Sequence, residues 1–307
     1  MRPLLGTLVE IRAYGPASCV TAGVAAAFSA IERVQRLMSF HECSSDVSRI
    51  NSAPVRRKIK VSRETYEVLY FARELSHRSG GVFDVTIAPS LVSAGFLPHP
   101  PPGGPSPEPP SGAGSASYDD LELASASVVR WRKKAWIDLG GIAKGYAVDT
   151  AIEALRAHRI EHGSVNAGGD LRCVGDRVPI HLRSPKSPNT GLISIGWLQD
   201  AAIATSASYF SGTDEGSHRI DPIVDPRLGR CIAWAASISV AAAHCMTADA
   251  LTKVVQLAPA ASLPALLEHY NAQAVIVDRL GVRVRGQDWL HCAGGVSQPC
   301  VGKVAVR

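Results

Sequence analysis

The sequence lacks the features that define several large classes of protein. Its seven cysteines are an odd number and include no CxxC pair, so we expect neither a zinc site nor a disulfide framework, but reduced and mostly buried thiols. No apolar run is long enough to cross a bilayer, and we expect no membrane span. The chain also has neither the GxxxxGK[ST] phosphate loop nor the GxGxxG dinucleotide motif.

A signal peptide is absent from the start of the sequence. Residues 1–12 run directly into the alternation Leu8-Val9-Glu10-Ile11, without the charged start and apolar segment of an export signal. We therefore expect a cytoplasmic protein, and a periplasmic one if the natural start lies upstream.

The composition is that of an ordinary globular protein. Of 307 residues, 46% are hydrophobic and 19% are charged. This length is near the upper limit for one hydrophobic core, which leaves open one large domain or two fused lobes. The net charge of +5 suits an anionic ligand such as a dinucleotide, but the basic residues are too scattered to predict nucleic-acid binding.

Helices and strands are predicted in mixed order, without the regular alternation of a parallel sheet. Apolar spacing predicts helices over 20–38, 62–77, 145–158, 246–257 and 263–270. Strands are predicted over 4–13, 135–139, 163–167, 272–278 and 282–285. The expected fold class is therefore α+β (mixed α/β). Residues 98–117, rich in Pro, Gly and Ser, are expected to form a disordered surface loop within one domain over 1–307.

The segment 137–146 has the residues needed to bind a pyrophosphate. A predicted strand ends at Asp138, and Gly140 and Gly141 allow a ligand to approach the backbone closely. A helix begins near Ala143, so its free N–H groups and the ammonium of Lys144 can face an anion. The same pattern is also typical of an ordinary strand-to-helix turn with a surface lysine.

Two later segments carry polar groups beside turns or helix starts. Asn166 precedes Gly168 and Gly169, so its amide can contact a flavin or ribose edge, although a plain hairpin turn has the same sequence pattern. Thr247 is a candidate helix cap, with Asp249 in the first turn. Asp249 and Thr252 are three residues apart on one helix face and can hold a hard cation; a capped helix with an early acidic residue is the more common interpretation of this pattern taken alone.

Further polar stretches occur at 205–208, 218–221 and 225–229. Taken with the glycine-rich segments, they resemble the ordered motifs of the FAD:protein FMN transferase family, also called ApbE. Members of that family carry DLGGIAKGYAVD, NAGGD, TSG, H-x-x-DPxTG and TADALxT segments in this order. The corresponding segments here are 138–149, 166–170, 205–206, 225–229 and 247–251, and earlier similarities lie at 5–7, 38–51 and 80–89. The similarity covers nearly the whole chain except the Pro-rich segment.

The resemblance implies a site for FAD and Mg²⁺. The implied FAD contacts are Leu5, Ala94, Gly95, Asp138, Lys144, Asn166 and Ile223. The implied metal ligands are the carbonyl of Gly141 and the side chain of Asp249, completed by a helix hydroxyl. The implied reaction transfers FMN from FAD to a Thr or Ser hydroxyl of an acceptor flavoprotein and releases AMP.

Two departures from the family pattern concern the chemistry. Lys253 stands where the family has a metal-binding Thr, with Thr252 one residue earlier. Thr252 takes over the ligand role, Lys253 partly replaces the cation, or metal binding is weak. Pro222 stands where the family has a His, so we expect His218 or Asp221 to act as the catalytic base.

Other departures concern the fit of the ligand: Leu5 replaces Met, Ala94 replaces Trp, and Ala207 replaces the Gly of TSG. Three functions agree with these residues. The chain is an FMN transferase, an FAD-binding protein that has lost transfer, or an FAD pyrophosphatase in which water replaces the acceptor hydroxyl.

Overall fold

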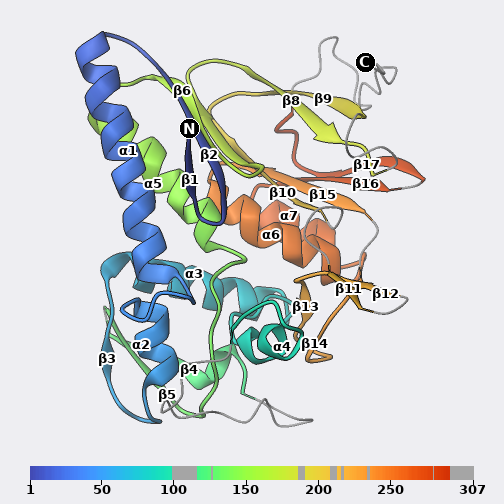
Figure 1. Cartoon of the computed structure of the whole chain (residues 1–307). Coiled ribbons are helices and arrows are strands. Elements are labelled where there is room, and N and C mark those ends of the chain that lie inside the picture. Colours follow the sequence, from blue (N-terminus) through green and yellow to red (C-terminus); the bar gives the residue numbers. More distant parts are fainter. Residues whose placement is uncertain are drawn as a thin grey trace. The chain divides into compact units, whose positions relative to one another are not determined.

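The computed structural model describes residues 1–98, 116–125, 127–185, 191–207, 213–215, 218–233, 236–278 and 280–290, without the side chains of residues 125, 213–215 and 218–220. The chain divides into two compact units (Figure 1). Unit 1 comprises Met1–Glu32, Lys144–Gly212 and Trp234–Arg307, and unit 2 comprises Arg33–Ala143 and Thr213–Ala233. That one domain spans the chain stays a prediction.

Unit 1 is built on a sheet of eight strands in the order β1-β2-β6-β7-β10-β15-β16-β17, and all neighbours are antiparallel. The strands are β1 (Arg2–Leu4), β2 (Thr7–Tyr14), β6 (His162–Ala167), β7 (Asp170–Val174), β10 (Ala202–Ala207), β15 (Ser237–Ala242), β16 (Gln273–Asp278) and β17 (Gly281–Gly286). Every residue of β15 is buried, as expected for a central strand covered on both faces.

Helices and a hairpin cover the two faces of this sheet. α6 (Cys245–Leu257) contacts β7, β10 and β15, and α7 (Leu263–His269) contacts β17. The hairpin of β8 (Val178–Arg183) and β9 (Leu192–Leu198) lies on the opposite side (Figure 1) and packs Ile180 and Leu198 against Ile203 and Val275. Unit 1 also contains α1 (Ala17–Met38) as far as Glu32 and α5 (Ala143–Ala157) from Lys144 onward. The predicted α+β class is confirmed.

The N-terminal strand differs from the prediction of one strand over 4–13. β1 and β2 form a hairpin whose turn is Leu5-Gly6, with φ angles of 56° and 70°. A two-residue hairpin turn requires positive φ at its central residues, and Gly6 supplies one such position without strain. Apolar residues alternate on both sides of this turn, so the sequence pattern predicted one continuous strand instead of two.

Unit 2 contains short helices and small sheets. Its helices are α2 (Asp46–Ser52), α3 (Arg63–Arg78), α4 (Ala88–Ser93) and the 3₁₀ turn η1 (Tyr118–Asp120). Its sheets are β3 (Ile59–Lys60) with β5 (Val128–Trp131) and β4 (Leu121–Ser125), β11 (Thr213–Glu215) with β12 (His218–Ile220), and β13 (Val224–Asp225) with β14 (Arg230–Cys231). Fully buried Ile50, Val68, Leu75 and Trp131 belong to its core.

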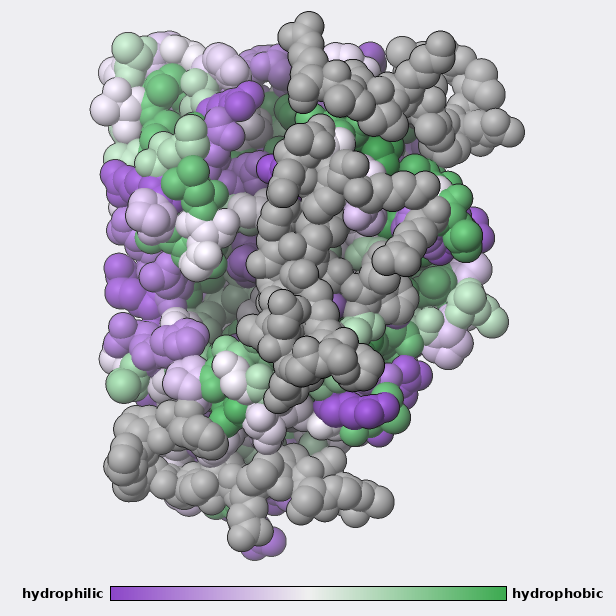
Figure 2. All heavy atoms as spheres, turned by 45° about the vertical axis from the view of Figure 1, so that its right-hand side comes forward, coloured by the Kyte–Doolittle hydropathy of each residue, from purple (hydrophilic) through white to green (hydrophobic). Residues whose placement is uncertain are grey.

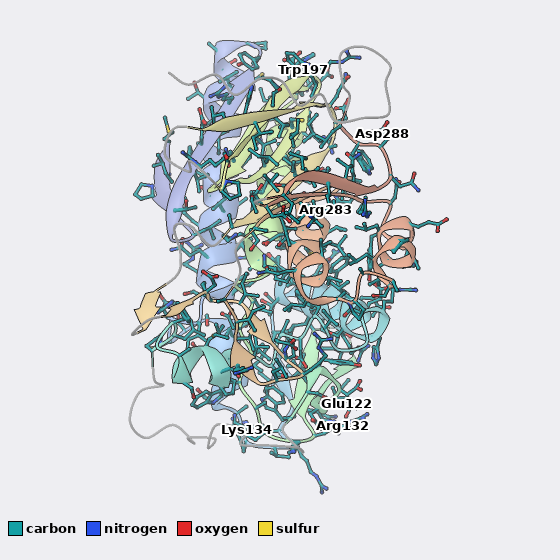
Figure 3. The ribbon with its side chains drawn as sticks, turned by 90° about the vertical axis from the view of Figure 1, so that its right-hand side faces the viewer. Glu122, Arg132, Lys134, Trp197, Arg283 and Asp288 are labelled. Carbon is teal, nitrogen blue, oxygen red and sulfur yellow. The ribbon has the colours of Figure 1, made fainter. Side chains whose placement is uncertain are left out.

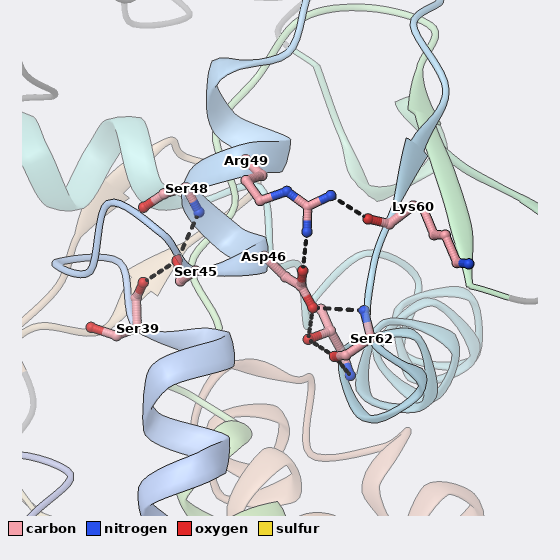
Figure 4. A network of polar contacts seen from close by, with 8 residues as sticks. Ser39, Ser45, Asp46, Ser48, Arg49, Lys60 and Ser62 are labelled. Atoms are coloured by element: carbon pink, nitrogen blue, oxygen red, sulfur yellow. Dashed lines mark hydrogen bonds and ion pairs between the residues drawn. The ribbon is translucent and has the colours of Figure 1, made fainter.

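A buried carboxylate joins two helices of unit 2 (Figure 4). Asp46, at the start of α2, accepts hydrogen bonds from the Ser62 N–H and the Thr65 hydroxyl at 2.8 Å each, and pairs with Arg49 at 2.8 Å. Ser45 and Ser62 cap α2 and α3 with their side-chain oxygens. The predicted start of the second helix, at Ser62, is therefore confirmed.

The predicted strand over 135–139 is wrong. The segment is buried but pairs with no strand: the side chain of Asn51 accepts from the Ile137 N–H at 2.8 Å and donates to the Ile137 carbonyl at 2.9 Å. An amide side chain offers a donor and an acceptor at once, so Asn51 makes the two backbone hydrogen bonds that a neighbouring strand would otherwise make.

Lys134 does not lie on a solvated face with the neighbouring basic residues. Arg132 pairs with Glu122 on β4 (Figure 3), and so does Arg130. The Lys134 ammonium instead donates to the carbonyls of Asn51 and Ala53 at 2.5 and 2.7 Å. Burial lowers the pKa of Lys134 to about 8, since the charged form loses hydration there.

Most of the predicted loop over 98–117 lies outside the described residues. Its last two residues are ordered: the Ala116 carbonyl accepts from the Thr86 hydroxyl at 3.4 Å, and the Ser117 N–H donates to Asp120 at 3.0 Å. That residues 98–117 form a disordered loop stays a prediction.

The cysteines, the surface and the first helix bear on the cellular compartment of the protein. Among the described cysteines, Cys173 and Cys245 are buried and all five are free. Figure 2 shows hydrophobic side chains interspersed with hydrophilic ones on the face it draws. By length and composition alone α1 could cross a membrane, a property that it shares with core helices and signal sequences. The cytoplasmic location stays a prediction.

Candidate active site

Four charged side chains of unit 1 form two ion pairs, which we call the charged quartet. Lys144, in the first turn of α5, donates to Asp170 at the start of β7. Lys253 donates to Asp249, which lies one turn earlier on α6. The side chains of Asp170 and Asp249 are 2% and 1% exposed, whereas those of Lys144 and Lys253 are 33% and 22% exposed. The carboxylates are thus buried, whereas the lysine side chains that pair with them are partly exposed.

The quartet favours the charged forms of Asp249 and Lys144 but not that of Asp170. Burial alone would raise the pKa of Asp249, but Lys144 and Lys253 outweigh this effect and hold that pKa below its ordinary value. Burial and the neighbouring Asp249 carboxylate raise the pKa of Asp170. For Lys144, burial is outweighed by Asp170 and Asp249, which raise its pKa. Lys144 is therefore a permanent cation at neutral pH.

A glycine allows α5 and α6 to approach closely enough to fix Asp249. The Gly145 N–H donates to Asp249 Oδ2 at 3.1 Å. A Cβ atom at Gly145 would lie 2.3 Å from the Cys245 carbonyl oxygen, far inside van der Waals contact. Glycine at this position therefore allows the contact that orients the carboxylate.

The start of α6 differs from the prediction of a Thr247 cap. The helix begins at Cys245, so Asp249 lies beyond its first turn. Instead, Asp149 on α5 accepts from the N–H groups of Cys245 and Met246 at 2.9 Å each. Asp149 also pairs with buried Arg172 of β7 at 2.9 Å. A carboxylate from another helix thus replaces the local cap.

Asp149 was missed as a site-forming residue. It is the last residue of the segment 138–149, which carries the strongest similarity to the family. This position in the motif was the signal by which the sequence could have identified it. Burial raises the pKa of Asp149, although Arg172 and the two N–H groups oppose this effect.

Asn166 lies at the end of β6, beside the turn to β7. Its side-chain oxygen accepts from the Gly169 N–H at 2.9 Å, and Gly168 and Gly169 have φ angles of 64° and 102°. The hairpin turn expected from the sequence is thus present. On β10, Thr205 shares a 2.8 Å hydrogen bond with Ser239 of β15, which places the TS motif within the sheet.

The other predicted ligand-binding residues belong mostly to unit 2 and form no comparable cluster of charge. Asp138 accepts from the Gly140 N–H at 2.9 Å, and its own N–H donates to Val85. Gly141 follows in the turn before α5. Ala94 and Gly95 end α4, with a φ of 75° at Gly95. Leu5, in unit 1, occupies the β1–β2 turn.

The two candidate bases precede the β13–β14 hairpin. Asp221 is 1% exposed, and Ile223 accepts from the Ile232 N–H at 2.9 Å. Burial and the nearby Asp221 raise the pKa of Cys231 to about 11. His218 lies in β12, and its side chain is outside the described part of the chain. Their role as base stays a prediction.

The surroundings of Asp249 do not fit a bound divalent cation in this arrangement. An ammonium group already occupies Oδ1, and the Thr252 hydroxyl is fully buried and donates to the Asp249 carbonyl at 2.7 Å. Among the described residues, no group of three or more His, Cys, Asp or Glu side chains could hold a metal. The structure brings Lys144, Asp249, Thr252 and Lys253 together, but as a network of lysine ion pairs.

Comparison with known proteins identifies the family. The model of the ApbE family matches residues 5–277. A Vibrio cholerae FAD:protein FMN transferase is 31% identical over 229 residues, which are 72% of this chain and 69% of the relative. A Klebsiella pneumoniae FAD:protein FMN transferase is 26% identical over 228 residues, 74% of this chain and 71% of the relative. The solved flavin transferase ApbE from Vibrio cholerae has a TM-score of 0.74 and 25% identity, covering 94% of this chain and 96% of its own.

The family match covers most of the chain, and the charged quartet lies within it. The resemblance expected from the motifs is confirmed. The chain belongs to the ApbE family of flavin transferases.

Proposed function

We propose that this chain is an FAD:protein FMN transferase that uses a Thr or Ser hydroxyl of an acceptor flavoprotein. The observation that supports this function best is the charged quartet, in which two partly exposed lysines pair with two buried carboxylates in a chain of the ApbE family. Ammonium groups are suitable point charges for phosphate. FAD carries its negative charge on a diphosphate, so this part of the substrate has a matching partner.

The reaction breaks the phosphoanhydride bond of FAD and forms a phosphoester bond to the acceptor. The acceptor oxygen attacks the phosphorus of the FMN half of FAD, and the bond from that phosphorus to the bridging oxygen breaks. AMP leaves with the bridging oxygen, and the hydroxyl proton passes to a base, for which Asp221 or His218 stays the prediction. Such a transfer depends mainly on positioning and on neutralising the phosphoryl oxygens.

In this proposal, Lys144 neutralises the diphosphate. Its ammonium is held by Asp170, and its side chain is partly exposed. The start of α5 adds backbone N–H groups that favour an anion. Asn166, Asp138, Leu5, Ala94, Gly95 and Ile223 stay predicted FAD contacts.

The family resemblance predicts magnesium dependence, with Gly141 and Asp249 as the ligands, whereas the ion pair of Asp249 with Lys253 disfavours a bound divalent ion. If bound, Mg²⁺ would supply further charge neutralisation at the diphosphate. In the transfer itself the lysine side chains of the quartet neutralise the diphosphate, because the Asp249 carboxylate is engaged by Lys253.

The test is an incubation with FAD and an acceptor carrying an Asp-x-x-(Ser/Thr)-Gly-Ala-Thr site, followed by intact-mass measurement of the acceptor. We expect a gain of one FMN less one water, with AMP released in equal amount. An acceptor in which both hydroxyl-bearing residues of this site are replaced by Val should gain no mass. AMP with no acceptor gain would instead indicate an FAD pyrophosphatase, and bound FAD without AMP would indicate a binding protein.

The variant Lys144→Met tests the residue that carries the proposal. It removes the charge while keeping most of the side-chain volume, so we expect transfer to fall by at least about tenfold. Lys133→Met removes an exposed lysine of unit 2 and should leave transfer unchanged. Equal activity of both variants would contradict the role of Lys144.

A further inference from the structure

Asp249 already has a cation, and it comes from the same helix. The Lys253 ammonium donates both to Asp249 Oδ1 and, at 3.0 Å, to the Asp249 carbonyl. Thr252 donates to that same carbonyl, and the Gly145 N–H donates to Oδ2 at 3.1 Å. Both carboxylate oxygens and the backbone oxygen of Asp249 are therefore in hydrogen bonds.

A divalent ion and the Lys253 ammonium would compete for the same oxygen. Two cations on one carboxylate repel each other, and the repulsion is strong where burial lowers the effective dielectric constant. Asp249 is 1% exposed, so little water is present to screen it. Because Lys253 is tethered one helical turn away, its effective concentration at Asp249 is also high.

The exposure of the quartet decides which of its charges a ligand meets. Its formal charge is zero, with two ammonium groups and two carboxylates. The carboxylate side chains are at most 2% exposed, whereas the ammonium side chains are 22% and 33% exposed. An arriving diphosphate therefore meets the positive groups, while the negative groups behind them hold those cations in place.

We propose that Lys253 serves as the built-in cation of this enzyme, so that Lys144 and Lys253 together bind the diphosphate of FAD without a divalent metal ion. This inference rests on the proposed function. It selects one of the three alternatives left open by the sequence, in which Thr252 coordinates, Lys253 substitutes, or metal binding is simply weak. The fully buried Thr252 hydroxyl, already donating to Asp249, argues against the first.

The first experiment measures FAD binding through quenching of flavin fluorescence, once in EDTA and once in millimolar Mg²⁺. For the natural chain we expect the Kd to differ by less than about twofold between the two conditions. Lys253→Met should weaken binding in EDTA by about tenfold, as the loss of one charge-assisted contact predicts. Lys253→Arg keeps the charge and should retain metal-independent binding.

The second experiment needs no flavin and no activity. Binding of Mn²⁺ is followed by the loss of the free-ion electron paramagnetic resonance signal. The natural chain should bind Mn²⁺ weakly, whereas Lys253→Thr, which frees Asp249 and adds a hydroxyl oxygen, should bind at least about tenfold more tightly. Lys253→Met frees Asp249 without adding an oxygen and should fall between them. Circular dichroism establishes that each variant is folded.

Two results would overturn the inference. The first is a natural chain that binds FAD only when Mg²⁺ is present, and the second is a natural chain that binds Mn²⁺ as tightly as Lys253→Thr. Failure to bind FAD under both conditions would overturn the proposed function as well, so the two failures are distinguishable.

Discussion

Asp149 is a buried carboxylate whose partners come from two other elements. It holds the first N–H groups of α6 and pairs with Arg172, which is 5% exposed. Asp149→Asn keeps the shape but removes the charge, leaving the Arg172 guanidinium without its close anion. We expect the free energy of unfolding to fall by about 3 kcal/mol, the usual effect of breaking a buried pair, measured by urea titration.

Glu153 provides the matched control. It contacts the same guanidinium at 3.4 Å, but its side chain is 57% exposed. Glu153→Gln should therefore change the unfolding free energy by less than about 1 kcal/mol. If the two variants were equally destabilised, the capping of α6 by Asp149 would not be the cause.

Lys134 makes stability depend on pH in a definite direction. Its pKa is lowered to about 8 in the folded chain from an ordinary value of 10.5. Between these values the unfolded chain binds more protons, so this lysine makes the folded state more stable as the pH rises. The unfolding free energy of the natural chain minus that of Lys134→Met should therefore become more positive from pH 8 to pH 10, as measured by urea titration at each pH.

Arg132→Met is the control for that experiment. It removes a guanidinium of the same hairpin, and its effect on the unfolding free energy should not change with pH. A constant difference for Lys134→Met across the same range would show that its ammonium is not destabilised by burial.

The sequence predicted residues with local signals better than residues defined by distant partners. Lys144 and Asp249 were found because each lies in a motif beside a glycine-rich turn or a helix start. The capping role of Asp149 was missed because its two N–H partners lie 96 and 97 residues away along the chain. Periodicity and capping rules describe neighbours in sequence, so a cap donated by another helix is invisible to them.

At the scale of elements, the crossing of α5 and α6 depends on Gly145. Alanine has a higher helix propensity than glycine by about 1 kcal/mol, so Gly145→Ala would stabilise an isolated helix. Here the added Cβ would meet the Cys245 carbonyl oxygen at 2.3 Å and Met246 Cα at 2.8 Å. Both atoms are backbone and cannot move away cheaply, so we expect a net loss of about 1–3 kcal/mol, measured by urea unfolding.

Propensity and packing predict opposite signs for Gly145→Ala, which makes the experiment decisive. A gain in stability would mean that the two helices do not touch there. FAD binding should weaken along with stability, because the Gly145 N–H and the Asp249 carboxylate would be pushed apart.

Elements with strong periodicity were predicted well, and those held by side chains were not. The amphipathic helices at α1, α3, α5 and α6 and the β16–β17 hairpin occur close to their predicted bounds. The segment 135–139 looked like a strand because it is apolar throughout, yet its hydrogen-bond partner is the side chain of Asn51. Burial alone therefore does not distinguish a strand from an extended segment.

For the molecule as a whole, FAD should stabilise the folded chain. A ligand that binds only the folded state adds about 2.7 kcal/mol when its concentration is a hundred times the Kd. We expect FAD to raise the thermal midpoint by several degrees, followed by differential scanning calorimetry, and riboflavin, which lacks the diphosphate, to raise it much less. Lys144→Met should lose most of the shift with FAD, whereas Lys133→Met should keep it. Equal shifts with FAD and riboflavin would place the binding energy on the flavin ring and would contradict a diphosphate site at the charged quartet.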